Sequence, residues 1–502
     1  MRGMRRLVVA GVAASVIALG AIGGTAAATS GCSRTAVNTY AMQQNLHASS
    51  MLVKCGVLPG GHPDSSAAGP SPLFGGTDIN LITGAETLPH VTQSEDMVWA
   101  QGTTIVVKYN DSTGDAGSPF FYSGASVSTN GGASFTRLSP QPFTGHGNNY
   151  GDPVVVYNKN LGKWFAGDLA DRDCGAAIGI GIWTSNNGTS WSAAPCAHVN
   201  KSGGGDDREA LAVDNNPTST HYGRMYVAWN NFSTPNANLV IRHSDDGTTW
   251  SSPLTLASSS SSFTRDTGVT VTPNGTVLAY ALRETTDRSA KDYRVFRSTD
   301  GGASFSGGIN MAAGQAAPGR TGGGACGSLQ NIPPIWRYEG NGQLAAGSGS
   351  TVGYDYTRRD GGDLGNIYFV RSTDNGKTWS APVKLNDDSG SRAQWMPALA
   401  ETSAGHLVAT WYDRRNTTND DYQRFASVSI DGGVTWGPNE KVSDVTIKQP
   451  KQPDPFVQAC YAGDYNLDFA KSTSVLDAWT DGRVAISGTN QQDVFYDTLP
   501  AG

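Results

Sequence analysis

The sequence predicts an all-β fold made of many short strands joined by tight turns. The 502 residues include 63 Gly, 12 Trp and 18 Tyr, whereas charged residues make up only 16%. Gly permits turns that need a positive φ, and aromatic side chains favour strands. A short turn-like motif also recurs six times along the chain. Recurrence at a nearly constant period indicates that the strands belong to repeated units.

The recurring motif has the pattern Ser/Thr-x-Asp/Asn-x-Gly-x-Ser/Thr-Trp/Phe, with His in the first place of the third copy. The Asp or Asn side chain can accept backbone N–H groups across a hairpin turn, and the aromatic side chain can pack beneath it. Successive Asp or Asn positions are 55 to 59 residues apart, except for one step of 74 that places an insertion around 319–359. The copies are Ser128–Phe135, Thr184–Trp191, His243–Trp250, Ser298–Phe305, Ser372–Trp379 and Ser429–Trp436.

These copies resemble the Asp-box (BNR) repeat of sialidases and related proteins, and the resemblance covers most of the chain after residue 75. It implies a β-propeller of four-stranded blades. Another unit follows the last copy, with strands expected at 462–468, 475–479 and 493–497, and Asp78–Ile82 is expected to supply its missing outer strand. We therefore predict seven blades closed by an N-terminal strand, with six blades as the alternative because sialidases have six.

The N-terminus predicts export from the cell. Arg2, Arg5 and Arg6 precede an apolar stretch at 7–20 and small residues at 26–28, which is typical of a signal peptide. We expect a signal peptide over 1–28, an extension or linker over 29–74 and the propeller over 75–502. The apolar stretch is too short and Gly-rich for a membrane span. Lipid anchoring at Cys32 is disfavoured because it would leave five cysteines, so free secretion is predicted.

Six cysteines allow 15 pairings. Sequence proximity favours Cys32–Cys55 and Cys174–Cys196, which leaves Cys326 with Cys460. The sequence contains no Cys-x-x-Cys motif and no Cys/His cluster that would indicate a metal site. No cofactor is expected, although the Asp-rich loops would suit a structural Ca²⁺. The net charge of −7 leaves no basic patch for nucleic acid. The chain is expected to be a monomer.

Charged residues gather where first strands begin and second strands end. In a four-stranded blade these positions share the face opposite the repeated turn, which is the face that carries the pocket in sialidase-like propellers. Carboxylates, or a Tyr with a Glu, can cleave a glycosidic bond, and guanidiniums bind carboxylates. The candidate catalytic residues are Asp207, Glu209, Tyr461 and Glu284. The candidate substrate-binding residues are Arg208, Arg265, Arg283, Arg414, Asp464 and Trp395.

A structural role is the competing interpretation for some of these residues. Trp411-Tyr-Asp413-Arg414 and Trp479-Thr-Asp481-Gly-Arg483 look like one recurring motif. Recurring Asp and Arg residues can tie neighbouring blades together rather than act on a substrate. Tyr461 can likewise line the central tunnel.

The predicted function is that of a secreted carbohydrate-active enzyme, a glycoside hydrolase acting on extracellular glycans. The resemblance implies an exo-sialidase, but the Arg-Ile-Pro motif of sialidases is absent. Arg208, Arg283 and Arg414 would have to replace the sialidase arginines, with Tyr461 and either Glu209 or Glu284 as the nucleophile pair. One alternative is a non-catalytic propeller that binds glycans or proteins. Another is a polysaccharide lyase whose base is a Tyr or a His, for which His146, His198 and His221 are available.

Overall fold

The computed structural model describes residues 31–43, 45–58, 74–138, 142–259, 262–285, 290–323, 326–327, 329–452, 454–455 and 457–502. The predicted signal peptide lies outside these residues, as do 59–73 of the predicted linker. The part of the extension that is described is helical: α1 (Arg34–Tyr40) and α2 (Leu46–Lys54) are joined by the Cys32–Cys55 disulfide. No helix in the described segments is long and apolar enough to cross a membrane.

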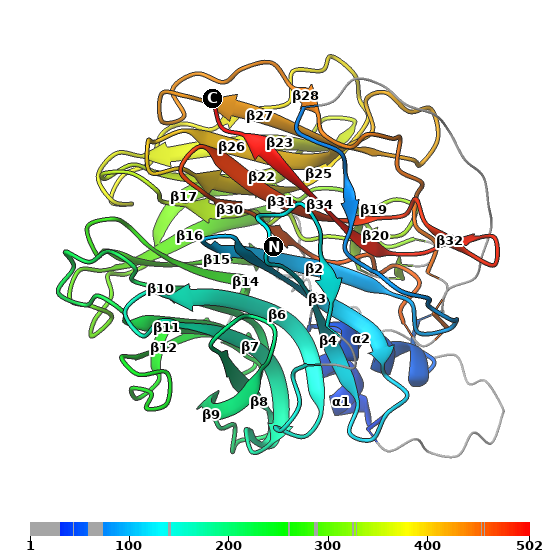
Figure 1. Ribbon diagram of the computed structural model, residues 1–502. Coiled ribbons are helices and arrows are strands. Elements are labelled where there is room, and N and C mark those ends of the chain that lie inside the picture. The colour runs from blue at the N-terminus through cyan, green and yellow to red at the C-terminus, as the bar shows by residue number, and fades with distance from the viewer. Residues whose placement is uncertain are drawn as a thin grey trace, which may run out of the picture.

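Four-stranded antiparallel units repeat along the chain, and the described residues contain seven of them (Figure 1). The first strands are β2 (Gln93–Gln101), β6 (Asn149–Asn158), β10 (Asp206–Val213), β14 (Ser262–Val271), β21 (Leu344–Ala345), β25 (Gln394–Glu401) and β30 (Phe469–Ala470). The second strands are β3 (Thr104–Gly114), β7 (Lys163–Arg172), β11 (Met225–Asn231), β15 (Val277–Thr285), β22 (Val352–Asp360), β26 (Leu407–Asp413) and β31 (Ser474–Asp481).

The third and fourth strands complete each unit. The third strands are β4 (Phe121–Ser128), β8 (Gly175–Ser185), β12 (Asn238–Ser244), β16 (Ala290–Ser298), β23 (Asp363–Ser372), β27 (Gln423–Ser429) and β34 (Asp493–Pro500). The fourth strands are β5 (Thr136–Arg137), β9 (Ser192–His198), β13 (Leu254–Ala257), β17 (Ile309–Ala316), β24 (Val383–Lys384), β28 (Glu440–Lys441) and, for the last unit, β1 (Ile79–Asn80) from the N-terminal side. The predicted closing strand is therefore confirmed.

All seven first strands line one central channel of about 260 Å³. A ring of four-stranded sheets around a channel is a β-propeller, so the predicted fold class is confirmed. The lining residues include Val98, Val154, Leu211, Val269, Leu344, Leu399 and Phe469, one from each first strand.

Apolar side chains pack between neighbouring units and close the ring. The cluster that joins the last unit to the first brings Leu476 and Tyr496 onto Val98 and Ile105. A second link is made by β29 (Asn466–Leu467), which pairs in parallel with β2. Closing the ring in this way hides the strand edges of the first and last units.

Two additions extend the repeated pattern. The predicted insertion before the fifth unit forms a small sheet of β18 (Arg320–Thr321), β19 (Gln330–Ile332) and β20 (Trp336–Arg337). The last unit carries a short hairpin of β32 (Ala485–Ile486) and β33 (Thr489–Asn490). The insertion is tied to the last unit by Cys326–Cys460, and Cys174–Cys196 closes a loop in the second unit. All three predicted disulfides are present, which indicates an oxidising compartment.

The six repeated turns connect third to fourth strands and share one set of hydrogen bonds. In the fifth copy, the Gly376 N–H donates to Ser372 Oγ at 2.8 Å and the Thr378 N–H donates to Asp374 Oδ1 at 2.9 Å. In the second and third copies the predicted register is wrong by one residue, because the acceptors are Asn187 and Asp246 rather than Asn186 and Asp245. The first hydroxyl of these two copies therefore belongs to Ser185 and Ser244.

Replacing Ser372 with Ala is expected to destabilise the chain by about 1–2 kcal/mol, because the buried hydroxyl both accepts from Gly376 and donates to Asp374. Urea denaturation measures the change. Ser389 is exposed, so Ser389→Ala is the matched control and should stay within about 0.5 kcal/mol of the parent. Equal effects of the two substitutions would contradict a stabilising role for the turn.

Candidate active site at the propeller mouth

The first strands of five units contain the same backbone irregularity close to where they begin. One residue in each has a positive φ, and the strand pairing shifts register beside it. Non-glycine residues with this backbone conformation are strained by roughly 1–3 kcal/mol and tend to cluster at functional sites. The five residues are Glu95 (φ 55°), Asp152 (62°), Arg208 (54°), Asp266 (53°) and Met396 (53°).

Four of these five residues are charged and come from the first four units. We call Glu95, Asp152, Arg208 and Asp266 the bulge quartet. In an antiparallel four-stranded unit the first and third strands run in the same direction and begin at the same edge. The repeated turns follow the ends of the third strands, so the quartet, near the beginnings of the first strands, lies on the opposite face. We call this end of the channel the mouth. Each member is at most 4% exposed, so the charges are almost completely removed from solvent.

Arg208 and Asp266 have unused hydrogen-bonding groups in the mouth. The Arg208 guanidinium lies over the Tyr465 ring at 3.4 Å, and its Nε and one Nη find no acceptor in the described residues. Neither carboxylate oxygen of Asp266 accepts a hydrogen bond from that same part of the chain. Burial raises the pKa of Asp266 to about 7, although Arg208 and Arg265 act to lower it. Asp266 can therefore carry a proton near neutral pH.

Asp152 lies beside Arg208 and differs from Asp266 in its bonding. One carboxylate oxygen accepts the Arg208 backbone N–H at 2.8 Å, and the other has no partner among the described residues. Burial raises the pKa of Asp152 to about 6, and Arg208 opposes this shift. Both carboxyls therefore have raised pKa values and both interact electrostatically with the Arg208 guanidinium, but they differ in bonding, since Asp152 accepts a backbone N–H and Asp266 accepts none in the described residues.

Tyr461 and Glu95 share one donor. The Asn110 amide donates to Glu95 at 2.6 Å and to the Tyr461 hydroxyl at 2.9 Å. Burial raises the pKa of Glu95 well above its ordinary value, and Asp464 and Asp152 add to this. Glu95, which the prediction did not include, is therefore a carboxyl that shares a donor with Tyr461.

The insertion contributes a guanidinium that the sequence did not single out. Arg337 Nε lies 3.0 and 3.1 Å from the two carboxylate oxygens of Asp464, and the guanidinium lies over the Tyr461 ring at 4.8 Å. The Asp464 N–H in turn donates to Glu95 at 2.9 Å. Asp464 is therefore placed at the mouth as predicted, but it is already paired with a cation of the chain itself.

The two predicted catalytic glutamates are buried and differ in their bonding: Glu284 lies in an ion-pair network, whereas neither oxygen of Glu209 accepts a hydrogen bond in the described residues. Glu284 accepts Lys291 Nζ at 2.6 Å and forms an ion pair with Arg265 at 2.9 Å. Arg265 also pairs with Glu339, at 3.3 Å. Glu209 is fully buried, and its pKa is raised by burial and by the nearby Asp152 and Asp168.

Three predicted substrate-binding residues have partners elsewhere. Arg283 forms an ion pair with Asp292 on the adjacent strand. Arg414 donates to the Pro333 carbonyl and to Gln449, and burial lowers its pKa to about 10. Trp395 is fully buried among aromatic side chains, so it is a core residue. Its neighbours are Trp336, Tyr412 and Tyr422.

The recurring Trp-x-Asp motif has the structural role that the competing interpretation gave it. Asp413 accepts the Trp411 indole N–H at 2.9 Å, and Asp481 accepts the Trp479 indole N–H at the same distance. Asp481 also binds Arg483, which reaches Asp78 at 2.6 Å near the closing strand. In the sixth unit the equivalent arginine is Arg415 rather than Arg414. These pairs tie the scaffold together.

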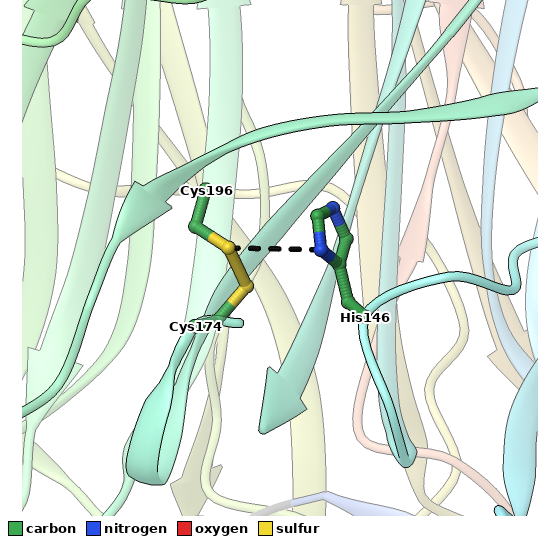
Figure 2. Close-up of side chains that lie close together, drawn as sticks. All are labelled: His146, Cys174 and Cys196. Carbon is green, nitrogen blue, oxygen red and sulfur yellow. Dashed lines mark hydrogen bonds between the residues drawn. A yellow bond between two sulfur atoms is a disulfide. The ribbon is translucent and has the colours of Figure 1, made fainter. Parts of the chain in front are cut away.

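The histidines considered for a lyase reaction have partners away from the quartet. His146 faces the Cys174–Cys196 disulfide, with Nδ1 3.8 Å from Cys196 Sγ (Figure 2). This is the one His/Cys/Asp/Glu cluster of metal-binding size in the described residues, and its sulfurs are joined to each other, so they are not thiolate ligands. His198 bonds Asp206 and stacks on Trp229, and His221 packs against Gly301 on the turn face.

Asp207 completes the mouth and contacts the N-terminal helices. It is 1% exposed and accepts the Asn45 amide at 2.6 Å. Of the predicted site residues, Asp207, Arg208, Tyr461 and Asp464 therefore gather at the mouth, with Arg265 in the adjoining network. The sequence does carry a signal for the quartet: Glu95, Asp152 and Met396 precede the serine of their own repeated turn by the same number of residues.

Comparison with known proteins finds no family model and no curated protein that matches the chain. Among solved structures, an ulvan lyase described as a new family of polysaccharide lyase matches 82% of this chain and 94% of its own, at 10% identity and a TM-score of 0.49. A protein of unknown function from Dyadobacter fermentans matches 70% of this chain and 95% of its own, at 13% identity and a TM-score of 0.43.

An α-L-arabinanase from Penicillium chrysogenum matches 57% of this chain and 92% of its own, at 15% identity and a TM-score of 0.34. Similarities of this size do not identify an activity, and a shared fold does not imply a shared function. The function has to be inferred from the residues at the mouth.

Proposed function

We propose that the chain is a secreted glycoside hydrolase whose active site is the bulge quartet at the propeller mouth. The observation that carries this proposal is the set of unused polar groups on two buried residues of first strands, Arg208, which lines the channel, and Asp266, which precedes the channel-lining Thr267. Buried polar groups without partners are costly. A ligand rich in hydroxyl groups would supply the missing donors and acceptors.

The roles follow from the two different carboxyls. Asp266, with its pKa raised to about 7, donates a proton to the glycosidic oxygen as the bond to the anomeric carbon breaks. Asp152, one oxygen of which is held by the Arg208 backbone N–H, accepts a proton with its other oxygen from the water that adds to the anomeric carbon. Arg208 donates its free N–H groups to a sugar oxygen. Such acid–base pairs are how most glycosidases act.

A neutral glycan fits this mouth better than a sialic acid. Arg265 and Arg337 are each already paired with carboxylates of the chain, and Arg283 and Arg414 have partners elsewhere. Arg208 forms no ion pair in the described residues and keeps its Nε and one Nη without an acceptor there, whereas the other four arginines each have a carboxylate, carbonyl or amide partner. A three-arginine grip on a substrate carboxylate is therefore not assembled, so exo-sialidase activity is not proposed.

Replacing Asp266 with Asn is expected to lower kcat by about 10²-fold or more, because the amide has no proton to transfer. Release of reducing ends from neutral and acidic extracellular polysaccharides measures the rate. Asp152→Asn should lower kcat similarly, whereas Asp420→Asn, at an exposed position, should leave it unchanged. Hydrolysis that survives Asp266→Asn would refute the assignment. Glycan binding without hydrolysis by any form of the protein would favour a non-catalytic binding propeller.

A further inference from the structure

Helix α2 lies across the mouth. Its side chains meet residues from the first, second and third units, from the insertion and from the segment before β29. The two helices lie together beside β4 and β6 in Figure 1. These contacts include Asp207, which adjoins Arg208 of the quartet in sequence, and Tyr461, which shares a donor with Glu95, so α2 lies against the face of the propeller that carries the quartet.

The polar side chains of α2 and its N-cap form hydrogen bonds with two charged residues and one tyrosine of the mouth. The Asn45 amide donates to Asp207 at 2.6 Å, and Arg337 donates to the Ser49 hydroxyl at 2.7 Å. Ser50 accepts the Tyr122 hydroxyl at 3.1 Å. A neutral amide and two hydroxyls therefore bind where a glycan would present its own neutral hydroxyl groups.

The apolar contacts of α2 are aromatic. Leu46 is fully buried against Tyr122, Val457 and Tyr461. The His47 ring stacks on Phe120 at a centroid distance of 5.2 Å and meets the edge of Tyr150 at 4.4 Å. Aromatic side chains around a polar mouth are also suited to the apolar faces of sugar rings.

The helical hairpin is attached to the propeller mainly by these contacts. Its disulfide, Cys32–Cys55, joins the hairpin to itself. The other two disulfides, Cys174–Cys196 and Cys326–Cys460, include no residue of the hairpin. The hairpin can therefore leave the mouth as one folded unit without breaking a covalent bond.

We propose that α2 occupies the ligand position of the mouth, so that docking of α2 and binding of a glycan exclude each other. The inference rests on the proposed function, since it assumes that the mouth is the ligand site. The docked chain is then a closed form of the enzyme. Its apparent affinity for ligand equals the affinity of the undocked form multiplied by the fraction of molecules in which the hairpin is undocked. The smaller that fraction is, the weaker the apparent binding.

The substitution Asn45→Asp tests this inference in the full chain. Asn45 is the N-cap of α2 and accepts the Ala48 N–H at 2.7 Å, a role that Asp performs equally well. The new carboxylate would instead face the Asp207 carboxylate, and like charges repel. Asn38→Asp, at an exposed position of α1, is the matched control because it adds the same charge to the same hairpin.

Two readouts report undocking without reference to activity. Amide hydrogen exchange over residues 46–54 is expected to accelerate at least tenfold in Asn45→Asp and to stay at the parent value in Asn38→Asp. Covalent labelling of Asp266 with a carbodiimide and a small amine should appear in Asn45→Asp alone. Hydrolysis of the best glycan of the panel should rise at least tenfold in kcat/KM in the same variant.

The outcomes separate the two proposals. Unchanged exchange in both Asn45→Asp and a second variant, Leu46→Asp, would show that α2 is a fixed part of the fold and would overturn the inference. The inference is also overturned if α2 undocks and a measurable kcat/KM does not rise. Undocking with labelled Asp266 but no hydrolysis or binding of any glycan would instead overturn the proposed function.

Discussion

Replacing Arg337 with Met is expected to destabilise the folded chain by about 3–5 kcal/mol. Arg337 is the cation that compensates Asp464, which is 1% exposed, and the two side chains meet in a double hydrogen bond across 127 residues of sequence. Met keeps an unbranched, apolar side chain in place of the aliphatic part of Arg337 but leaves the buried carboxylate uncompensated. Losing one partner of a buried pair is costly because the other partner cannot return to water.

The size of this effect should depend on pH. Burial raises the pKa of Asp464, and removal of Arg337 raises it further because the guanidinium acts to lower it. When the pKa of a carboxyl is higher in the folded chain than in the unfolded chain, that carboxyl destabilises the folded state at pH values at which it is ionised in the unfolded chain. Lowering the pH protonates the carboxyl and removes this destabilisation. The destabilisation by Arg337→Met should therefore be larger at pH 8 than at pH 5.

Urea denaturation at the two pH values measures both effects. Arg320 is exposed on β18 of the same insertion, so Arg320→Met is the matched control and should change the free energy of unfolding by less than about 0.5 kcal/mol. A loss below about 1 kcal/mol for Arg337→Met would mean that the pair with Asp464 does not stabilise the chain.

Acidification from pH 7 to pH 4.5 is expected to weaken docking of α2 by about 100-fold. Burial, with a contribution from Lys54, lowers the pKa of His47 from 6.5 to about 3. In the undocked hairpin His47 regains its ordinary pKa, so the undocked form binds a proton that the docked form excludes. Docking is at full strength above pH 6.5 and weakens about tenfold, or about 1.4 kcal/mol, for each pH unit between 6.5 and 3.

The surroundings of His47 explain why the docked ring stays neutral. Its Nδ1 has no hydrogen-bond partner in the described residues, and the pKa is lowered by burial and by Lys54. Lys54 is the nearest cation on its own helix, and Asp115 is occupied by the Tyr122 hydroxyl and by Lys54. The ring contacts four aromatic side chains, from α1, from the start of β4 and from β6: Tyr40, Phe120, Tyr122 and Tyr150.

Hydrogen exchange of residues 46–54 at pH 7.0 and 4.5, corrected for intrinsic exchange, measures this pH dependence. His47→Phe should preserve the aromatic packing and abolish the loss of protection in acid. His221→Gln, which removes a histidine on the opposite face, should retain that loss. If His47→Phe loses protection in acid as strongly as the parent chain, another group controls docking.

Features that depend on local sequence could be predicted, and features built by distant segments could not. The repeated turns are encoded by neighbouring residues, and their period led to the correct closing strand, whereas the proximity of the cysteines in sequence led to the correct disulfide pairs. The register failed only at Asn186-Asn187 and Asp245-Asp246, where two suitable acceptors are adjacent. At the mouth, Asp207 and Asp464 could be proposed because they begin or precede inner strands.

The missing site residues depend on three-dimensional contacts. Arg337 reaches Asp464 from an insertion whose sequence gives no sign of its position. Glu95 becomes the neighbour of Tyr461 only after the last unit meets the first. The helical extension was predicted only as an extension or linker, because α2 is short and its apolar residues are few. Its docking depends on residues contributed by several units.

The closing strand has a consequence for how the chain reaches its native state. Asn80 on β1 binds Asp493 on β34 across 413 residues of sequence. Contacts of such separation carry a large loop-closure cost and form late. Until β34 is available to pair with β1, the ring is an open array with two unpaired edges that can aggregate. We therefore expect removal of β1 or of β34 to prevent folding of the whole ring, with loss of soluble protein rather than of one blade.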